Sequence, residues 1–124
     1  MSIPDILVLK DRPISPGDLR TLRDRFFIDM VKYVADIAQG VLAVGGELHA
    51  DAEAVLLEAG SRQTDLWGAN YYPGLGASDC IEYTSLINIR PSQGNRSMVI
   101  ESDEIRSRVE ALTFRLIGKG EALP

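Results

Sequence analysis

The sequence predicts an α+β fold: a single-domain mixed or antiparallel sheet with about three helices, in the coarse order β-α-β-β-α-β-β-α. Helical spacing of apolar residues recurs in three segments, and short runs rich in β-branched and aromatic residues lie between them. The chain has 124 residues, 45% of them hydrophobic and 25% charged, which is the size and composition of one globular domain. We therefore predict one α+β domain over residues 1–124.

Local signals mark the first strand and the first helix. Residues 6–9 form a short apolar run, which predicts a strand that ends before Pro13. Ser15 is then placed to cap a helix, and Pro16 stands at the first helical position, where no backbone N–H is needed. We predict a helix over about residues 15–27.

The segment 29–46 is compatible with two structures. An alternating pattern runs from 31 to 37, and Gln39-Gly40 supplies a turn before the apolar run 41–44. Because β-branched and aromatic residues favour strands, we predict a hairpin. The alternative is a continuation of the first helix, for which these residues have the required spacing: Leu22, Phe26, Met30, Tyr33 and Ile37.

A second helix and an aromatic strand follow. Residues 47–59 place apolar side chains on one helical face, and Gly60 can end that helix, although its amino cap is weak. Residues 64–72 predict a strand, in which Gly68 marks a bulge or a point of close backbone approach.

The last third of the chain contains the clearest alternation and the clearest helix. Period-2 alternation predicts a strand over 81–89, followed by a polar turn at 90–97 and a brief return strand at 98–100. Ser102 then caps the final helix, which runs to about Gly118.

The charge and the single cysteine restrict the classes of function. The 13 basic and 18 acidic residues give a net charge of −5, which disfavours binding to nucleic-acid phosphates. No apolar run is long enough to cross a membrane, and the amino terminus lacks a secretion signal. Cys80 cannot form an internal disulfide, which is typical of a reducing compartment. We predict a soluble cytoplasmic protein without a nucleic-acid or membrane partner.

The segment 47–53 contains the only histidine, surrounded by three carboxylates. On a strand all four side chains would share one face as a metal site, whereas the predicted helix aligns only His49 with Glu53. A neighbouring carboxylate can orient an imidazole for proton transfer, so His49, Asp51 and Glu53 are candidate catalytic residues. The competing interpretation is a surface pair near the first turn of a helix. We predict no metal and no cofactor, since the chain lacks the ligands of a zinc site.

The polar turn 90–97 is a second candidate site. Arg90, Asn95 and Arg96 are candidate ligand-binding residues, because guanidinium and amide groups beside a glycine turn can bind a carboxylate or a phosphate. Alternatively, these side chains satisfy the backbone of the turn or pair with nearby acidic residues. The chain has no phosphate-loop or dinucleotide-binding motif.

The aromatic segment 64–72 is a third candidate. Asp65, Trp67 and Asn70 are candidate ligand-binding residues there, because aromatic side chains with polar groups suit a ligand pocket or an interface. The main alternative is a place in the core. Cys80 is interpreted as a small buried or loop residue.

Three phrases, GGELHADAE, GSRQTDLWGANYYP and INIRPSQGNRS, together resemble a small bacterial family of uncharacterised proteins of about this length. The resemblance runs from about residue 30 to residue 117. The family has no established activity, so the resemblance implies no substrate and no cofactor. It marks the positions to test first: His49, Asp51, Glu53, Asp65, Trp67, Asn70, Arg90, Asn95 and Arg96.

These observations lead to three hypotheses of function. We predict a protein that binds a small anionic ligand or a protein partner through residues 90–97. The second hypothesis is a small enzyme with His49 as acid or base beside Asp51 and Glu53, and the third is an interaction module that uses residues 64–72. We also predict a homodimer, because exposed strand edges are usually covered.

Overall fold

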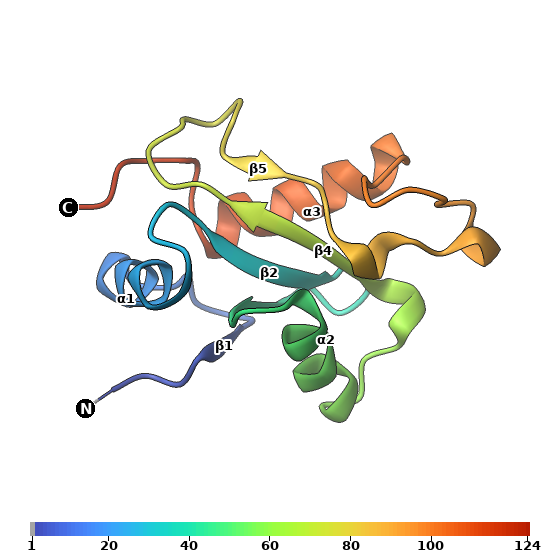
Figure 1. The fold of residues 1–124 in the computed structure, drawn as a ribbon, viewed down its shortest axis with the longest axis horizontal. Coiled ribbons are helices and arrows are strands. Elements are labelled where there is room, and N and C mark those ends of the chain that lie inside the picture. The colour runs from blue at the N-terminus through green and yellow to red at the C-terminus, as the bar shows by residue number, and fades with distance from the viewer. Residues whose placement is uncertain (1) are drawn as a thin grey trace.

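A five-stranded antiparallel sheet forms the centre of the computed structural model, which describes residues 2–124 (Figure 1). The strands lie in the order β1-β3-β2-β4-β5. Their bounds are β1 (Ile6–Leu9), β2 (Val31–Asp36), β3 (Val41–Gly45), β4 (Leu66–Tyr71) and β5 (Ile81–Glu82). The predicted α+β fold and the predicted order of its elements are confirmed.

Three α-helices connect or follow the strands: α1 (Pro16–Phe26), α2 (His49–Glu58) and α3 (Asp103–Leu116). The predicted caps are confirmed, because the Ser15 hydroxyl oxygen accepts from the Asp18 N–H at 3.1 Å and that of Ser102 accepts from the Ile105 N–H at 3.2 Å. The predicted weak amino cap of α2 is also confirmed, since Leu48 occupies its N-cap position without a side-chain hydrogen bond. None of the helices in residues 2–124 combines the length and apolar character that a bilayer crossing requires.

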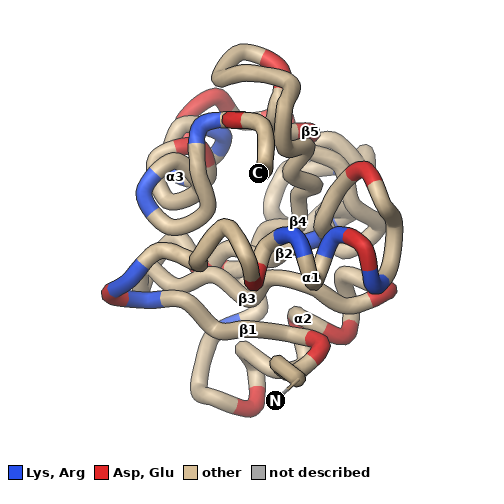
Figure 2. Tube along the Cα trace, turned by 90° about the vertical axis from the view of Figure 1, so that its left-hand side faces the viewer, with Lys and Arg blue, Asp and Glu red and all other residues tan. Residues whose placement is uncertain are grey.

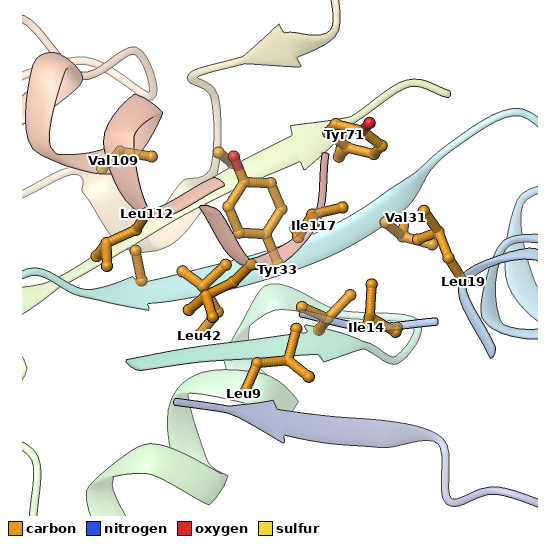
Figure 3. Packing of buried hydrophobic residues seen from close by; sticks show 14 of the residues in the cluster. Leu9, Ile14, Leu19, Val31, Tyr33, Leu42, Tyr71, Val109, Leu112 and Ile117 are labelled. Atoms are coloured by element: carbon orange, nitrogen blue, oxygen red, sulfur yellow. The ribbon is translucent and has the colours of Figure 1, made fainter. Parts of the chain in front are cut away.

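The helices cover both faces of the sheet (Figure 2). α1 and α3 pack on one face, where Tyr33 of β2 is fully buried and its hydroxyl lies 2.6 Å from the Thr113 hydroxyl of α3. Figure 3 shows this larger core around Tyr33. α2 packs on the opposite face through Ala52 and Leu56, which contact the alternate strand residue Val34. The open amino end of α2 therefore lies on the face opposite the larger core.

The predicted hairpin at 29–46 is confirmed, and the alternative of a longer first helix is wrong. α1 ends because Ile28 adopts a left-handed conformation, with a φ of 71°, which reverses the chain before β2 begins. Asp36 then stabilises the β2–β3 turn, since its carboxylate accepts from the backbone N–H groups of Ala38 and Gln39. β2 pairs with both β3 and β4, which places it in the middle of the sheet.

The predicted strand over 81–89 is wrong in its extent. β5 contains only Ile81 and Glu82, and the chain then leaves the sheet and forms a short 3-10 helix at Leu86–Asn88. The cause is Asn88, whose side-chain amide accepts from the Gly68 N–H and donates to the Gly68 carbonyl, both at 2.9 Å. A side chain thus fills the position beside β4 that a longer β5 would have taken.

Further predictions concern the segment before α3 and its contact with β4. The predicted return strand at 98–100 is reduced to one isolated bridge between Thr84 and Val99. The close approach predicted at Gly68 is confirmed, because a Cβ atom there would lie 2.6 Å from the Ser85 Cβ.

β1 has a strand partner on one side only within residues 2–124, and the homodimer stays a prediction.

Candidate functional site

A row of polar residues crosses three strands on the α2 face of the sheet. Lys32 of β2 lies directly opposite Asn70 of β4, and Asn70 lies opposite Glu82 of β5. Directly opposite residues of antiparallel strands place their side chains on the same face. Lys32 shares its face with Val34, two residues along β2, which packs under α2. The row therefore continues the surface on which α2 lies.

A cleft of about 320 Å³ opens above this row, between α2 and the segment that follows β5. This volume is at the lower end of the range for small-molecule sites. The lining residues are Lys32, Leu48, His49, Ala50, Asn70, Thr84, Ser85, Leu86, Ile87 and Met98. Two sequence candidates, His49 and Asn70, are thus brought together in one cleft.

Asn70 is only 7% exposed and has a fixed orientation. Its Nδ2 donates to Oε1 of Glu82 at 2.7 Å, and the Tyr72 hydroxyl donates to the same oxygen at 3.2 Å. Rotating the amide would bring its oxygen against the carboxylate, so Nδ2 must face Glu82. Oδ1 of Asn70 is consequently an enclosed acceptor without a hydrogen-bond partner in residues 2–124.

His49 is 9% exposed, and its ring nitrogens have different roles. Nε2 lies 2.9 Å from the Ala69 carbonyl oxygen. A carbonyl oxygen only accepts, so Nε2 carries the proton and Nδ1 of the neutral ring is an acceptor. Burial lowers the pKa of His49 below its ordinary value of 6.5, although the bond to Ala69 and the adjacent Asn70 side chain oppose this shift, so the ring is neutral at pH 7. Nδ1 has no partner in residues 2–124 and is not fully enclosed.

The amino end of α2 forms one wall of the cleft. The N–H groups of His49 and Ala50 occupy its first two helical positions, which cannot bond within the helix, and Leu48 offers them no side-chain acceptor. Free N–H groups and the helix dipole make such an end attractive to an anion. Lys32 adds a positive charge nearby, with its Nζ 4.9 Å from the centre of the Phe27 ring.

The outer wall of the cleft is apolar. Leu48, Leu86 and Met98 are exposed hydrophobic residues that line it, and Leu86 is 70% exposed. A ligand that covers these side chains would remove apolar surface from water, which favours binding. The cleft thus combines a cationic wall, two unpartnered acceptors and an apolar wall.

The other two candidate catalytic residues have different surroundings from His49. Asp51 is exposed, and Glu53 is half-buried with an enclosed Oε2 atom that finds no hydrogen-bond partner among the described residues. Within residues 2–124, no hydrogen bond or ion pair joins either carboxylate to His49. The part of the chain that the structure describes contains no group of three or more His, Cys, Asp or Glu residues placed to hold a metal ion.

Arg90 lies against the indole of Trp67 and holds the end of β4. Its guanidinium carbon is 4.1 Å from the centre of the Trp67 ring. Its terminal nitrogens donate to the carbonyl oxygens of Gln63, at 2.5 Å, and Leu66. Burial lowers the pKa of Arg90, and the charge of Glu53 opposes this shift. Trp67 is buried, which agrees with the alternative interpretation of the aromatic segment as part of the core.

The remaining candidates lie outside the cleft lining. Asn95 is buried, and its Nδ2 donates to the carbonyl oxygens of Asn88, Ser97 and Val99 at 2.8 to 3.0 Å. Arg96 is exposed and uses its backbone N–H to donate to Glu101. Asp65 lies in the 3-10 turn that precedes β4.

Sequence reasoning missed the two charged residues of the polar row, Lys32 and Glu82. Their proximity to Asn70 depends on strand order, which the sequence does not reveal. The weak cap at Leu48 was the one signal in the sequence that pointed to an open helix end.

Comparison with known proteins identifies the family of the chain. No curated protein and no solved structure matches it. The model of the family described as "Protein of unknown function (DUF5674)" matches residues 7–116, which is most of the chain, and confirms the expected membership of an uncharacterised family. The fold and the cleft described above therefore belong to a member of the DUF5674 family.

Proposed function

We propose that this protein binds a small organic anion in the cleft at the amino end of α2. The observation that carries the proposal is the open end of α2, whose free N–H groups at His49 and Ala50 meet the cleft beside Lys32. An anion placed there would accept hydrogen bonds from the N–H groups and interact with the ammonium group. The enclosed, unpartnered Oδ1 of Asn70 is independent support for a ligand at the same place.

The polar turn 90–97 receives less support as the anion site. Arg90 directs its terminal nitrogens at the Gln63 and Leu66 carbonyl oxygens, and Asn95 uses its amide within its own segment. Donors already paired with buried backbone groups are costly to redirect to a ligand. Arg96 is exposed on the surface, whereas the α2 cleft offers unpaired N–H groups in a concave site.

A carboxylate titration tests the proposal directly. The probe is 4-methylpentanoate, which has a carboxylate for the α2 end and a branched chain for the apolar wall. In two-dimensional NMR spectra, we expect the amide signals of His49 and Ala50 to shift on addition of millimolar probe. A protein whose α2 signals do not move would contradict the proposal.

Charge variants locate the site. Lys32→Met should weaken binding of 4-methylpentanoate at least fivefold, because the ammonium group is lost from the cleft. Lys10→Met is the matched control, because Lys10 is an exposed lysine that does not line the cleft. Equal loss of affinity in both variants would indicate nonspecific attraction and would contradict binding in the cleft.

A further inference from the structure

We infer, resting on the proposed function, that the ligand is a hydroxy acid with an apolar side chain, whose hydroxyl group donates to Nδ1 of His49. The carboxylate would occupy the open end of α2 beside Lys32. The apolar side chain would lie along Leu48, Leu86 and Met98. This assignment follows from the donors and acceptors that the walls of the cleft leave unpaired.

The end of the cleft that His49 and Asn70 line, called the polar end below, presents hydrogen-bond acceptors. A ligand there must therefore offer a hydrogen-bond donor. The Ala69 carbonyl fixes the proton on Nε2 of His49, which leaves Nδ1 as an acceptor that is not fully enclosed. Oδ1 of Asn70 is a second acceptor without a donor, and Glu82 keeps its amide from rotating. A carboxylate alone brings only further acceptors. A ligand that satisfies this end must carry an O–H or N–H group as well.

The charges around the cleft favour a hydroxyl over an ammonium group as that donor. Lys32 lines the same cleft and would repel a second cation. Glu82 is the nearest acidic side chain in the polar row, but its Oε1 already accepts from Asn70 and Tyr72. A neutral hydroxyl donates to His49 without this repulsion from Lys32.

The apolar residues of the outer wall determine the apolar part of the ligand. Leu86 and Met98 belong to the segment after β5, and Leu48 belongs to the start of α2. A branched aliphatic chain would bury the apolar surface of these side chains while its polar groups reach α2 and His49.

Three ligands of similar size test the inference on the unmodified chain. They are 2-hydroxy-4-methylpentanoate, 4-methylpentanoate and leucine, which carry a hydroxyl group, no donor and an ammonium group at the same carbon. We expect the hydroxy acid to bind at least tenfold more tightly than 4-methylpentanoate, and leucine to bind more weakly than the hydroxy acid. Affinities are measured by calorimetry and by NMR titration of the full chain.

His49→Gln tests the assigned acceptor. A glutamine amide can retain the donor to the Ala69 carbonyl, but it has no acceptor at the position of Nδ1. This variant should bind the two acids with equal affinity, while its circular dichroism spectrum matches that of the unmodified chain. Lys32→Met should weaken both acids by the same factor and so retain the preference.

The outcomes separate this inference from the proposed function. Equal binding of the two acids by the unmodified chain would overturn the hydroxy-acid assignment and leave anion binding intact. Tighter binding of leucine would overturn it in favour of an amino acid. A preference that persists in a folded His49→Gln variant would remove His49 from the assignment. If none of the three ligands shifts the α2 signals, both the inference and the proposed function are wrong.

Discussion

The guanidinium group of Arg90 lies over the indole ring of Trp67, 4.1 Å from its centre, and donates to two backbone carbonyl oxygens next to β4. Asn88 pairs with the backbone of Gly68 along the same strand. Two side chains thus satisfy backbone groups that a neighbouring strand would otherwise pair. Arg90, a candidate anion-binding residue in the sequence, makes these structural contacts.

Replacing Arg90 and Arg96 in turn tests whether Arg90 stabilises the fold. Arg90→Met should lower the free energy of unfolding by about 2 kcal/mol, because charge-assisted hydrogen bonds to partly buried carbonyl groups are lost. Arg96→Met is the matched control and should change it by less than about 0.5 kcal/mol, since Arg96 is exposed. Urea denaturation measures both values. Similar losses in the two variants would contradict the structural role of Arg90.

The contact between β4 and the segment after β5 depends on glycine. A methyl group at Gly68 would lie 2.6 Å from the Ser85 Cβ, so Gly68→Ala should destabilise the fold by about 1–3 kcal/mol through overpacking. Adding Ser85→Gly should recover part of this loss, which a double-mutant cycle would measure. Gly17→Ala is the control, because a Cβ there meets nothing within 4 Å.

Ile28 is a strained residue at the end of α1. It is 75% exposed and has a φ of 71°, a conformation that costs a β-branched residue about 1–2 kcal/mol. Ile28→Gly should therefore stabilise the protein by about 1 kcal/mol in thermal or urea unfolding. Ile28→Val keeps the branched side chain and should give no gain. A destabilised glycine variant would show that the isoleucine side chain makes contacts worth more than the strain.

The stability of the protein should fall on acidification through the titration of His49. Burial lowers its pKa in the folded state below the ordinary value of 6.5, so the unfolded chain binds the proton first as the pH falls. The free energy of unfolding should decrease from pH 6.5 down to the pKa of the folded state. His49→Gln should lack this part of the decrease.

The same titration is directly observable, because His49 is the only histidine. The NMR signals of its imidazole should report a midpoint below pH 6.5 in the folded chain. A midpoint at or above that pH would show that the ring is not held in its neutral form, and would contradict its assigned role as an acceptor.

Elements with local start and stop signals could be predicted from the sequence. Ser15 with Pro16 and Ser102 with its acidic first turn determine helix starts through contacts within a few residues. The segment 81–89 could not be predicted in the same way. Its alternation is typical of a strand, but the Asn88 side chain takes the place beside Gly68, twenty residues away in the chain.

The candidate site could likewise be predicted only in part. His49 and Asn70 were candidates because their residue types carry chemistry, whereas their shared cleft depends on the register of β2, β4 and β5. The expected partner of His49 was Glu53, one helical turn away. The structure gives His49 the Ala69 carbonyl instead, because the amino end of α2 rests on β4.

The attachment of the outer wall has a consequence for the motions of the protein. After β5, residues 84–99 are joined to β4 by the amide of Asn88 and the guanidinium of Arg90, and they are held together by the amide of Asn95. Such a segment can detach without breaking the hydrogen bonds between β2, β3 and β4. In hydrogen–deuterium exchange, its amides should therefore exchange as a group through local opening, well before those of β2.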